Sequence, residues 1–235
     1  MPAPILLHYW PTPNGWKASI MLEECGLPYE TRWIDIGAGD QFAPDFLSIA
    51  PNNRMPAIID PEGPDGAPIS VFESGAILLY LARKTGLFYP GDARGRVAVE
   101  EWLMWQMGGF GPMLGQNHHF SAYAPEPIAY AIQRYRDETA RLYGVLDRRL
   151  KGRDFIADTL SIADFACIGW AMPYERQGIA LDDFPHVAAW RARMLDRAGV
   201  RRGLALGLER RKGGFSEDER ARLLAERDTQ DPLTT

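Results

Sequence analysis

Two short stretches of this chain combine a turn with groups that could hold a peptide. Met55-Pro56 leads directly into the apolar run Ala57-Ile58-Ile59. A proline that starts a strand lacks an N–H and favours extended geometry in the preceding residue, so Met55 would offer unpaired backbone groups to an extended ligand. Glu73-Ser74 ends a second β-type run where a helical pattern begins, and could hold the ligand's charged end. Spacing alone fits two ordinary strand–turn junctions equally well.

Length and composition exclude several classes of protein. The 235 residues suffice for one large domain or two modest ones, and 46% apolar with 24% charged residues is typical of globular proteins. The net charge of −5 gives no reason to expect binding to nucleic acid or to an anionic membrane surface. No apolar run approaches the ~18–20 residues of a membrane span, and the N-terminus does not resemble a signal peptide.

The two cysteines, Cys25 and Cys167, show no metal-ligand spacing. We therefore expect a cytoplasmic protein without a disulfide framework and without a metal site.

Strand and helix signals alternate through residues 1–87. Apolar or alternating runs at 5–10, 29–36, 57–59 and 69–72 predict strands. Thr12 followed by Pro13 fits the N-cap of a helix that Gly26 and Pro28 end. Further helices are expected at 42–49 and 74–84. The order β-α-β-α-β-β-α predicts a compact mixed α/β domain.

Strand signals are absent after residues 87–94, which predicts an all-helical second domain over 94–235. Helices are expected at 94–106, 128–150 and 185–195. Glycines at 108, 109 and 111, with Pro112, are expected to kink the first of these helices or to break it in two. The sequence 161–164 resembles a capping box, which makes Asp164 structural. A second such sequence at 216–219 is expected to open a charged helix in the tail.

The chain resembles a cytosolic glutathione transferase over roughly residues 5–205. Three motifs in order carry the resemblance: Asn53-Arg54-Met55-Pro56-Ala57-Ile58, then 72–81, then 161–164. Thr12-Pro13-Asn14-Gly15, the segments 35–37 and 41–42, and the stretch 105–120 resemble the bacterial nu class more narrowly. The resemblance implies a thioredoxin-like N-terminal domain, an all-α C-terminal domain, a cis Met55–Pro56 bond and a homodimer.

Glutathione carries two carboxylates, an amine and a thiol, so a site for it needs several kinds of contact. Met55, beside Pro56, would clamp the middle of the tripeptide through its backbone. Glu73 suits the γ-glutamyl amine. Ser74, at the positive end of a helix, suits the adjacent carboxylate.

Other candidates follow from the resemblance. Asn53 belongs to the binding motif, and Gln41 and Arg54 would serve the other end of glutathione. Arg134 matches a position at which nu-class proteins hold a glutathione carboxylate, although from spacing alone it fits a solvated surface charge. A possible cleft for the second substrate contains Gln116, Asn117, His118 and His119, which also fit capping and hydrogen-bonding roles in a bent segment. Adjacent histidines face different sides of a helix and make a poor metal pair.

The thiol is the centre of the expected chemistry. A free thiol is mostly protonated at neutral pH, and donors at a helix start stabilise its thiolate. Thr12 or Asn14 could donate to the sulfur of bound glutathione, which makes them the catalytic candidates. Tyr9 and His8 lie on the preceding strand and fit the core better. Cys25 and Cys167 fit inert core thiols, so the attacking sulfur is expected to come from glutathione.

Three functions compete. The nu-class resemblance implies binding of two glutathione units or of glutathione disulfide, with disulfide-bond reductase activity on a small thiol or disulfide and weak conjugating activity. The first alternative is a transferase that conjugates glutathione to hydrophobic electrophiles. The second is a non-enzymatic binding or scaffold module, which the presence of Met55-Pro56 and Glu73-Ser74 disfavours.

Overall fold

A four-stranded sheet organises the N-terminal part of the computed structural model, which describes residues 2–210. Its strands are β1 (Ile5–Tyr9), β2 (Tyr29–Trp33), β3 (Ala57–Asp60) and β4 (Ile69–Phe72), in the order β2-β1-β3-β4. β1 and β2 are parallel, and the other neighbours are antiparallel. The tail helix expected from 216–219 onward lies outside the described residues.

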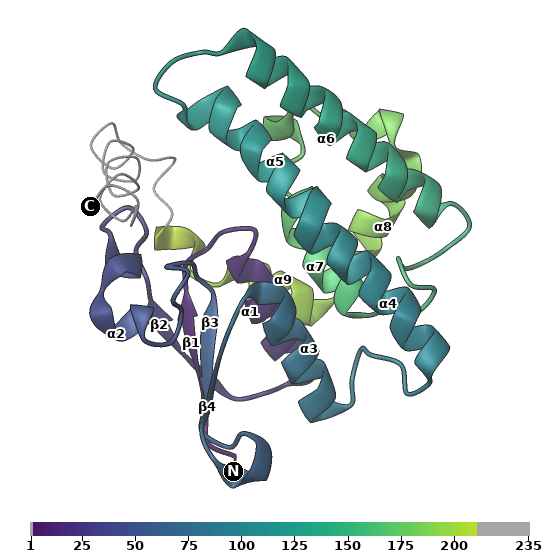
Figure 1. The fold of residues 1–235 in the computed structure, drawn as a ribbon. Coiled ribbons are helices and arrows are strands. Elements are labelled where there is room, and N and C mark those ends of the chain that lie inside the picture. Colours follow the sequence, from purple (N-terminus) through teal and green to yellow (C-terminus); the bar gives the residue numbers. More distant parts are fainter. Residues whose placement is uncertain (1, 211–235) are drawn as a thin grey trace.

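Helices cover both faces of this sheet. α1 (Gly15–Cys25) and α3 (Ser74–Thr85) lie between the sheet and the helical part of the molecule, and the short α2 (Pro44–Leu47) lies on the opposite side (Figure 1). The single helix expected over 42–49 is instead a 3₁₀ turn, Asp40–Phe42, followed by α2. The predicted order β-α-β-α-β-β-α is confirmed, and the fold of this part is thioredoxin-like.

The second part is helical throughout its described residues. α4 (Ala93–Trp105) and α5 (Gly111–His118) run end to end, and α6 (Ala129–Leu150) returns alongside them (Figure 1). The glycines interrupt the regular α-helix as expected: α4 ends at Trp105, and a π-helical turn, Gln106–Phe110, carries the chain into α5. A second π turn, His119–Tyr123, follows α5. Short 3₁₀ turns occur at Pro64–Gly66, Glu175–Gln177, Leu181–Asp183 and Leu208–Arg210.

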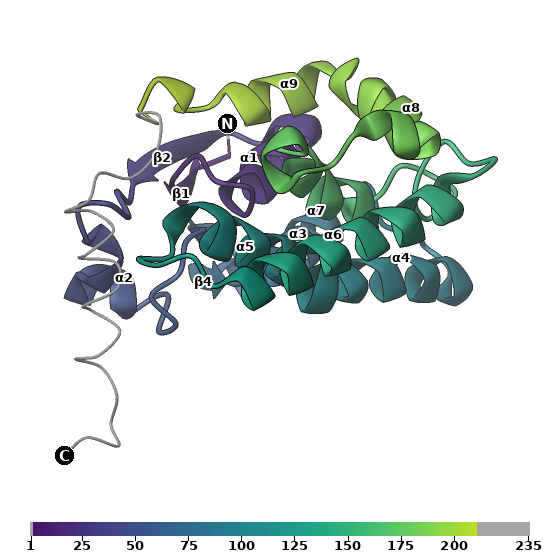
Figure 2. The ribbon, with the colours of Figure 1, turned by 90° about the horizontal axis from the view of Figure 1, so that it is seen from above.

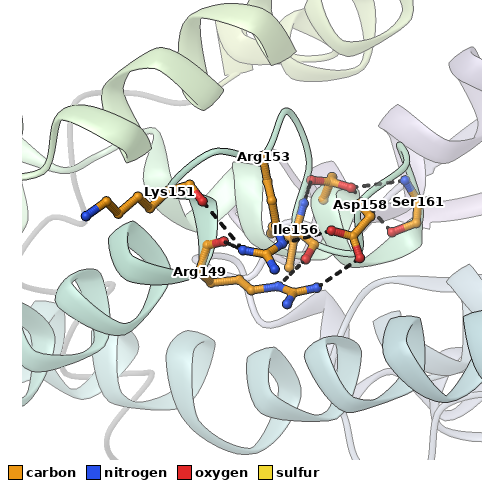
Figure 3. A network of polar contacts seen from close by, with 7 residues as sticks. Arg149, Lys151, Arg153, Ile156, Asp158 and Ser161 are labelled. Carbon is orange, nitrogen blue, oxygen red and sulfur yellow. Dashed lines mark hydrogen bonds and ion pairs between the residues drawn. The ribbon is translucent and has the colours of Figure 1, made fainter.

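α7 (Ile162–Ala171) is buried along its whole length, and its start is firmly fixed. Ser161 and Asp164 form the predicted capping box, and the buried Asp164 also accepts from the backbone N–H of Ile156. Figure 3 shows how the end of α6 holds the loop that leads to α7. The Arg149 side chain donates to the Ile156 carbonyl at 2.6 Å and pairs with Asp158 at 3.6 Å. The position of α7 is therefore set by polar contacts as well as by packing.

α8 (Pro185–Leu195) matches its prediction, whereas α9 (Ala198–Ala205) was not expected. α9 lies over α1 (Figure 2). A Cβ on Gly203 would stand 2.6 Å from the Ile20 backbone, so only glycine permits this close approach. Arg197 and Arg202 pair with Glu24 and Glu23 of α1. These two ion pairs therefore join the two parts of the chain.

Candidate active site

A cavity of about 1030 Å³ opens between the two parts of the chain, at the upper end of the ~300–1,000 Å³ usual for ligand pockets. Its lining brings together residues from the turn before α1, the segment before β3, the start of α3 and the region around α5. It includes most of the predicted site residues: Thr12, Asn14, Gln41, Asn53, Arg54, Met55, Pro56, Glu73, Ser74, Gln116 and His119.

The turn before α1 is fixed by its own hydrogen bonds. The helix starts two residues later than predicted, with Asn14 at the N-cap, but Thr12 holds the turn: its hydroxyl oxygen accepts from the Gly15 N–H at 3.1 Å and its carbonyl from the Trp16 N–H at 2.9 Å. Gly15 admits no side chain, since a Cβ there would stand 2.2 Å from the Trp10 carbonyl. The turn therefore presents Thr12 and Asn14 to the cavity at the positive end of an 11-residue helix.

α7 supports this turn from the helical part. The Trp170 indole N–H donates to the side-chain oxygen of Asn14 at 3.0 Å. An indole N–H can only donate, so the Asn14 amide must present its oxygen to Trp170, and its NH₂ group stays available to other acceptors. Gly169 permits the contact, because a Cβ there would stand 2.7 Å from the Pro13 carbonyl. Trp170 was not among the candidates that the sequence predicted.

Met55 has the geometry expected of a peptide clamp. The Met55–Pro56 bond is cis, as the resemblance implied. Within the described residues, the N–H and C=O of Met55 make no hydrogen bond. Its sulfur instead faces the turn before α1, where it accepts from the Trp10 N–H at 3.2 Å. A backbone donor and acceptor are thus left for an extended ligand.

The start of α3 carries a strained residue. Glu73 has φ +67° and ψ 118°, a conformation that side-chain-bearing residues rarely adopt. Its carboxylate is exposed and accepts from the Asn52 amide at 3.4 Å. Ser74 is only 4% exposed and begins the helix. Strain of this kind, on the order of 1–3 kcal/mol, often marks functional sites.

Lys17 was not predicted, and it lines the same cavity. Its side chain is 1% exposed, and its ammonium group donates to Gln106 at 2.7 Å and to Ser74 at 3.3 Å. Burial lowers the pKa of Lys17 to about 7, against a smaller opposing effect of Cys167 and Glu73. Residues three apart share a helix face, so the spacing from Asn14 to Lys17 was the available signal.

Three candidates lie outside the lining. Arg134 is exposed on α6. Asn117 is 1% exposed and donates to the Thr139 hydroxyl and the Gln177 carbonyl, both at 3.0 Å. His118 is 9% exposed and packs against Trp170. Their predicted roles in ligand binding stay proposals.

Neither cysteine lines the cavity. Cys25 lies at the end of α1, 3.7 Å from the Thr85 hydroxyl, and Cys167 is fully buried in α7. Burial raises the pKa of both thiols, so both remain protonated at neutral pH. Tyr9 is also fully buried and donates to the Leu206 carbonyl at 3.1 Å.

Among residues 2–210, no group of three or more histidine, cysteine, aspartate or glutamate side chains could hold a metal ion. In the same part of the chain, no helix is both long enough and apolar enough to cross a membrane.

The fold and the cleft define the class of protein: a thioredoxin-like domain joined to a helical domain, with a ligand cavity between them. The family model for the glutathione S-transferase N-terminal domain matches residues 3–83, and the model for the C-terminal domain matches residues 112–198. The chain belongs to the glutathione transferase family.

Individual members of this family are similar to the chain over most of its length. The disulfide-bond oxidoreductase YfcG of Escherichia coli is 50% identical over 200 residues, which cover 84% of this chain and 93% of YfcG. A glutathione transferase from Pseudomonas putida, solved with one glutathione disulfide bound per subunit, has a TM-score of 0.83 at 44% identity, covering 86% of this chain and 91% of its own. A glutathione transferase from Burkholderia graminis, with two glutathione molecules bound per subunit, has a TM-score of 0.82 at 46% identity, covering 86% and 88%.

Proposed function

We propose that this chain is a glutathione-dependent disulfide-bond oxidoreductase. One observation carries the proposal: the cavity combines a peptide clamp at Met55, polar groups at Glu73 and Ser74, and donors at the turn before α1, and it is lined by no cysteine. A cavity equipped for a thiol peptide but lacking a protein thiol requires the ligand to supply the reacting sulfur. Glutathione meets this requirement.

The proposed reaction is thiol–disulfide exchange. The thiolate of one bound glutathione attacks a sulfur of the disulfide substrate, the substrate S–S bond breaks, and a mixed disulfide forms while the leaving thiolate takes up a proton. The thiolate of a second glutathione then attacks the glutathione sulfur of the mixed disulfide. This step releases the second substrate thiol and forms glutathione disulfide. Two thiols are oxidised and one substrate disulfide is reduced, so the electrons balance.

The chain's contribution is to hold the thiolate and both ligand ends. The Asn14 NH₂ group would donate to the sulfur, since the oxygen of the same amide accepts from Trp170, and Thr12 is the second catalytic candidate. Glu73 would pair with the γ-glutamyl amine and Ser74 with its carboxylate. Gln41, Asn53 and Arg54 line the cavity and would serve the rest of the ligand. The two glutathione units, or one glutathione disulfide, in the solved relatives support this assignment.

A second activity, conjugation of glutathione to hydrophobic electrophiles, is favoured by the aromatic side chains on the cavity wall. These are Phe42, Phe120, Tyr123 and Trp170. We expect this activity to be the weaker one, because the turn residues Thr12 and Asn14 are those shared with the disulfide-reducing nu class.

Two assays separate these activities. The purified chain should reduce hydroxyethyl disulfide with glutathione, followed by coupled consumption of reduced nicotinamide cofactor, and should conjugate a chlorodinitrobenzene electrophile only slowly. Replacing both Cys25 and Cys167 by alanine should preserve reductase turnover, whereas Asn14→Ala should lower it about tenfold or more, the loss expected for a charge-assisted hydrogen bond. Robust conjugation with negligible reduction would contradict the proposal, as would loss of reduction in the cysteine-free variant.

We also propose a cytoplasmic homodimer. Both cysteines are free thiols, as expected in a reducing compartment where glutathione itself is reduced. Exposed apolar side chains on α4 and at the end of the outer strand β4 give the dimer a candidate surface.

A further inference from the structure

The ammonium group of Lys17 is buried at the cavity without an acidic partner. Its three hydrogen-bond partners, the side chains of Gln106, Ser74 and Met107, are all uncharged. Among residues 2–210, no carboxylate forms an ion pair with it. A buried charge is costly unless it is paired. The charged form of Lys17 therefore lowers the stability of the fold unless a bound ligand supplies an anion.

Two donors converge on one weak acceptor beside Lys17. The Lys17 ammonium lies 3.3 Å from the Met107 sulfur, and the Ser74 hydroxyl lies 3.7 Å from the same atom. A thioether accepts hydrogen bonds only weakly. Lys17, Ser74 and Met107 all line the cavity, so this point of convergence lies at the cavity wall. An oxyanion there would receive a charge-assisted bond, a hydroxyl bond and the field of the α3 N-terminus.

We infer that Lys17 is the counter-ion of the γ-glutamyl α-carboxylate of glutathione, which it binds together with Ser74. The inference rests on the proposed function, since that function places the γ-glutamyl unit at Ser74. Among the groups of glutathione, only this carboxylate lies beside the amine that Glu73 would hold. Lys17 would therefore determine whether the ligand must carry an α-carboxylate.

The charges around Lys17 predict a proton uptake that accompanies binding. Glu73, before α3, and Cys167, on α7, are the ionisable groups whose electrostatic influence on Lys17 is resolved, and the Cys167 thiol stays protonated. With its pKa near 7, Lys17 is partly neutral at physiological pH, and a bound carboxylate raises that pKa. Binding should therefore be accompanied by proton uptake near and above pH 7, where Lys17 is partly neutral in the free protein.

The test uses S-methylglutathione, which has no thiol to ionise, and its 4-aminobutyryl analogue, which lacks only the α-carboxylate. Calorimetry with the full chain gives a dissociation constant for each ligand. For the wild type, loss of the carboxylate should weaken binding about tenfold or more. For Lys17→Met and Lys17→Gln, most of this difference between the two ligands should be lost, and the part that remains is that of Ser74 and the α3 N-terminus. Lys151→Met, which changes an exposed lysine beyond α6, should behave as the wild type.

Proton uptake is measured with S-methylglutathione at pH 7.5 in two buffers of different ionisation enthalpy. It should occur in the wild type and disappear in Lys17→Met, whose folding is checked by circular dichroism. A Lys17 variant that weakens both ligands equally would show a merely structural role and overturn the inference. Failure of the wild type to bind S-methylglutathione would contradict the proposed function as well, so the two failures are distinguishable.

Discussion

At the scale of one residue, Glu73 has two features that do not stabilise the fold. Its positive φ places a Cβ-bearing residue where glycine is favoured, and its carboxylate is exposed rather than engaged in an ion pair among the described residues. The positive φ strains the backbone, and the exposed carboxylate makes no ion pair within the described part of the chain that would stabilise the folded state. Both are expected where a side chain is held in place for a ligand.

Replacing Glu73 by glycine should separate these effects. The Glu73→Gly variant should be more stable by up to about 1 kcal/mol, because glycine relieves the backbone strain of the folded state. The gain is limited because glycine also makes the unfolded chain more flexible, which opposes folding. The same variant should bind S-methylglutathione about tenfold more weakly, because the amine loses its carboxylate partner. Thermal unfolding and calorimetry measure the two effects.

Glu73→Gln is the matched control, since it keeps the Cβ and removes the charge. It should bind as weakly as the glycine variant while unfolding at the wild-type temperature. If the glycine variant were instead destabilised, φ +67° would not be a source of strain at this position.

Residue chemistry in a short window predicted part of this cavity. A proline at a strand start indicated the Met55 clamp, and a helix start indicated Ser74, because both signals depend on adjacent residues. For Lys17 the only local signal was its spacing from Asn14, and Trp170 had none. Lys17 bonds to Gln106, 89 positions away, and Trp170 to Asn14, 156 positions away, so their roles depend on how the two parts of the chain pack.

At the scale of elements, α7 positions the turn that carries the catalytic candidates Thr12 and Asn14, without lining much of the cavity. It contacts the turn before α1 through Gly169 and Trp170, and its own start is fixed by the Ser161–Asp164 capping box. A helix held at one end by a cap and at the other by the turn can keep the Asn14 amide in one orientation. This support comes entirely from the helical domain.

Trp170→Phe tests this positioning role, because phenylalanine keeps an aromatic ring and removes the indole donor. The Asn14 amide could then turn its oxygen toward the sulfur, which would repel a thiolate. We expect reductase kcat to fall about tenfold with little change in KM for glutathione, and the pH–rate profile to move to higher pH. In an Asn14→Ala background, Trp170→Phe should have no further effect.

Trp190→Phe serves as the structural control. It removes a comparable indole bond, 2.9 Å long, from Trp190 to the buried Asp164. This variant should lose about 0.5–1.5 kcal/mol or more of stability without shifting the pH–rate profile. A Trp170→Phe variant that lost stability alone, with an unchanged profile, would show that Trp170 only packs.

Element prediction failed where packing overrode local propensity. Gly199 and Gly203 lower helix propensity, and this obscured α9, yet the contact of Gly203 with α1 leaves no room for a side chain. The glycines at 108, 109 and 111 suggested a kink or a break, but not the form that the interruption takes. There the chain stays helical through the π turn Gln106–Phe110. Met107, within this turn, lines the cavity.

At the scale of the whole molecule, both parts share one hydrophobic core. Buried side chains of the sheet, such as Leu7, belong to the same cluster as Ile77 of α3, Leu103 of α4 and Phe165 of α7. The cavity lies between the two parts, so its geometry depends on this shared core. Strand and helix patterns predicted the order of elements, but no local pattern indicates which faces meet.

The remaining apolar surface predicts how two copies of the chain would associate. Val97 and Met104 lie seven residues apart and therefore on one face of α4, where they are 54% and 53% exposed. Phe72, at the end of the outer strand β4, is 38% exposed. Met104→Glu should convert a dimer to a monomer at micromolar concentration in sedimentation experiments, because a charge would be buried in an apolar contact.

Tyr130→Glu is the matched control for this variant. Tyr130 is 77% exposed near the start of α6, away from the proposed surface on α4, so the variant should stay dimeric. Both variants should unfold close to the wild-type temperature if the dimer adds little stability, whereas a large loss in Met104→Glu alone would mean that folding depends on association. A wild-type chain that sediments as a monomer would contradict the dimer, and equal dissociation by both variants would place the interface elsewhere.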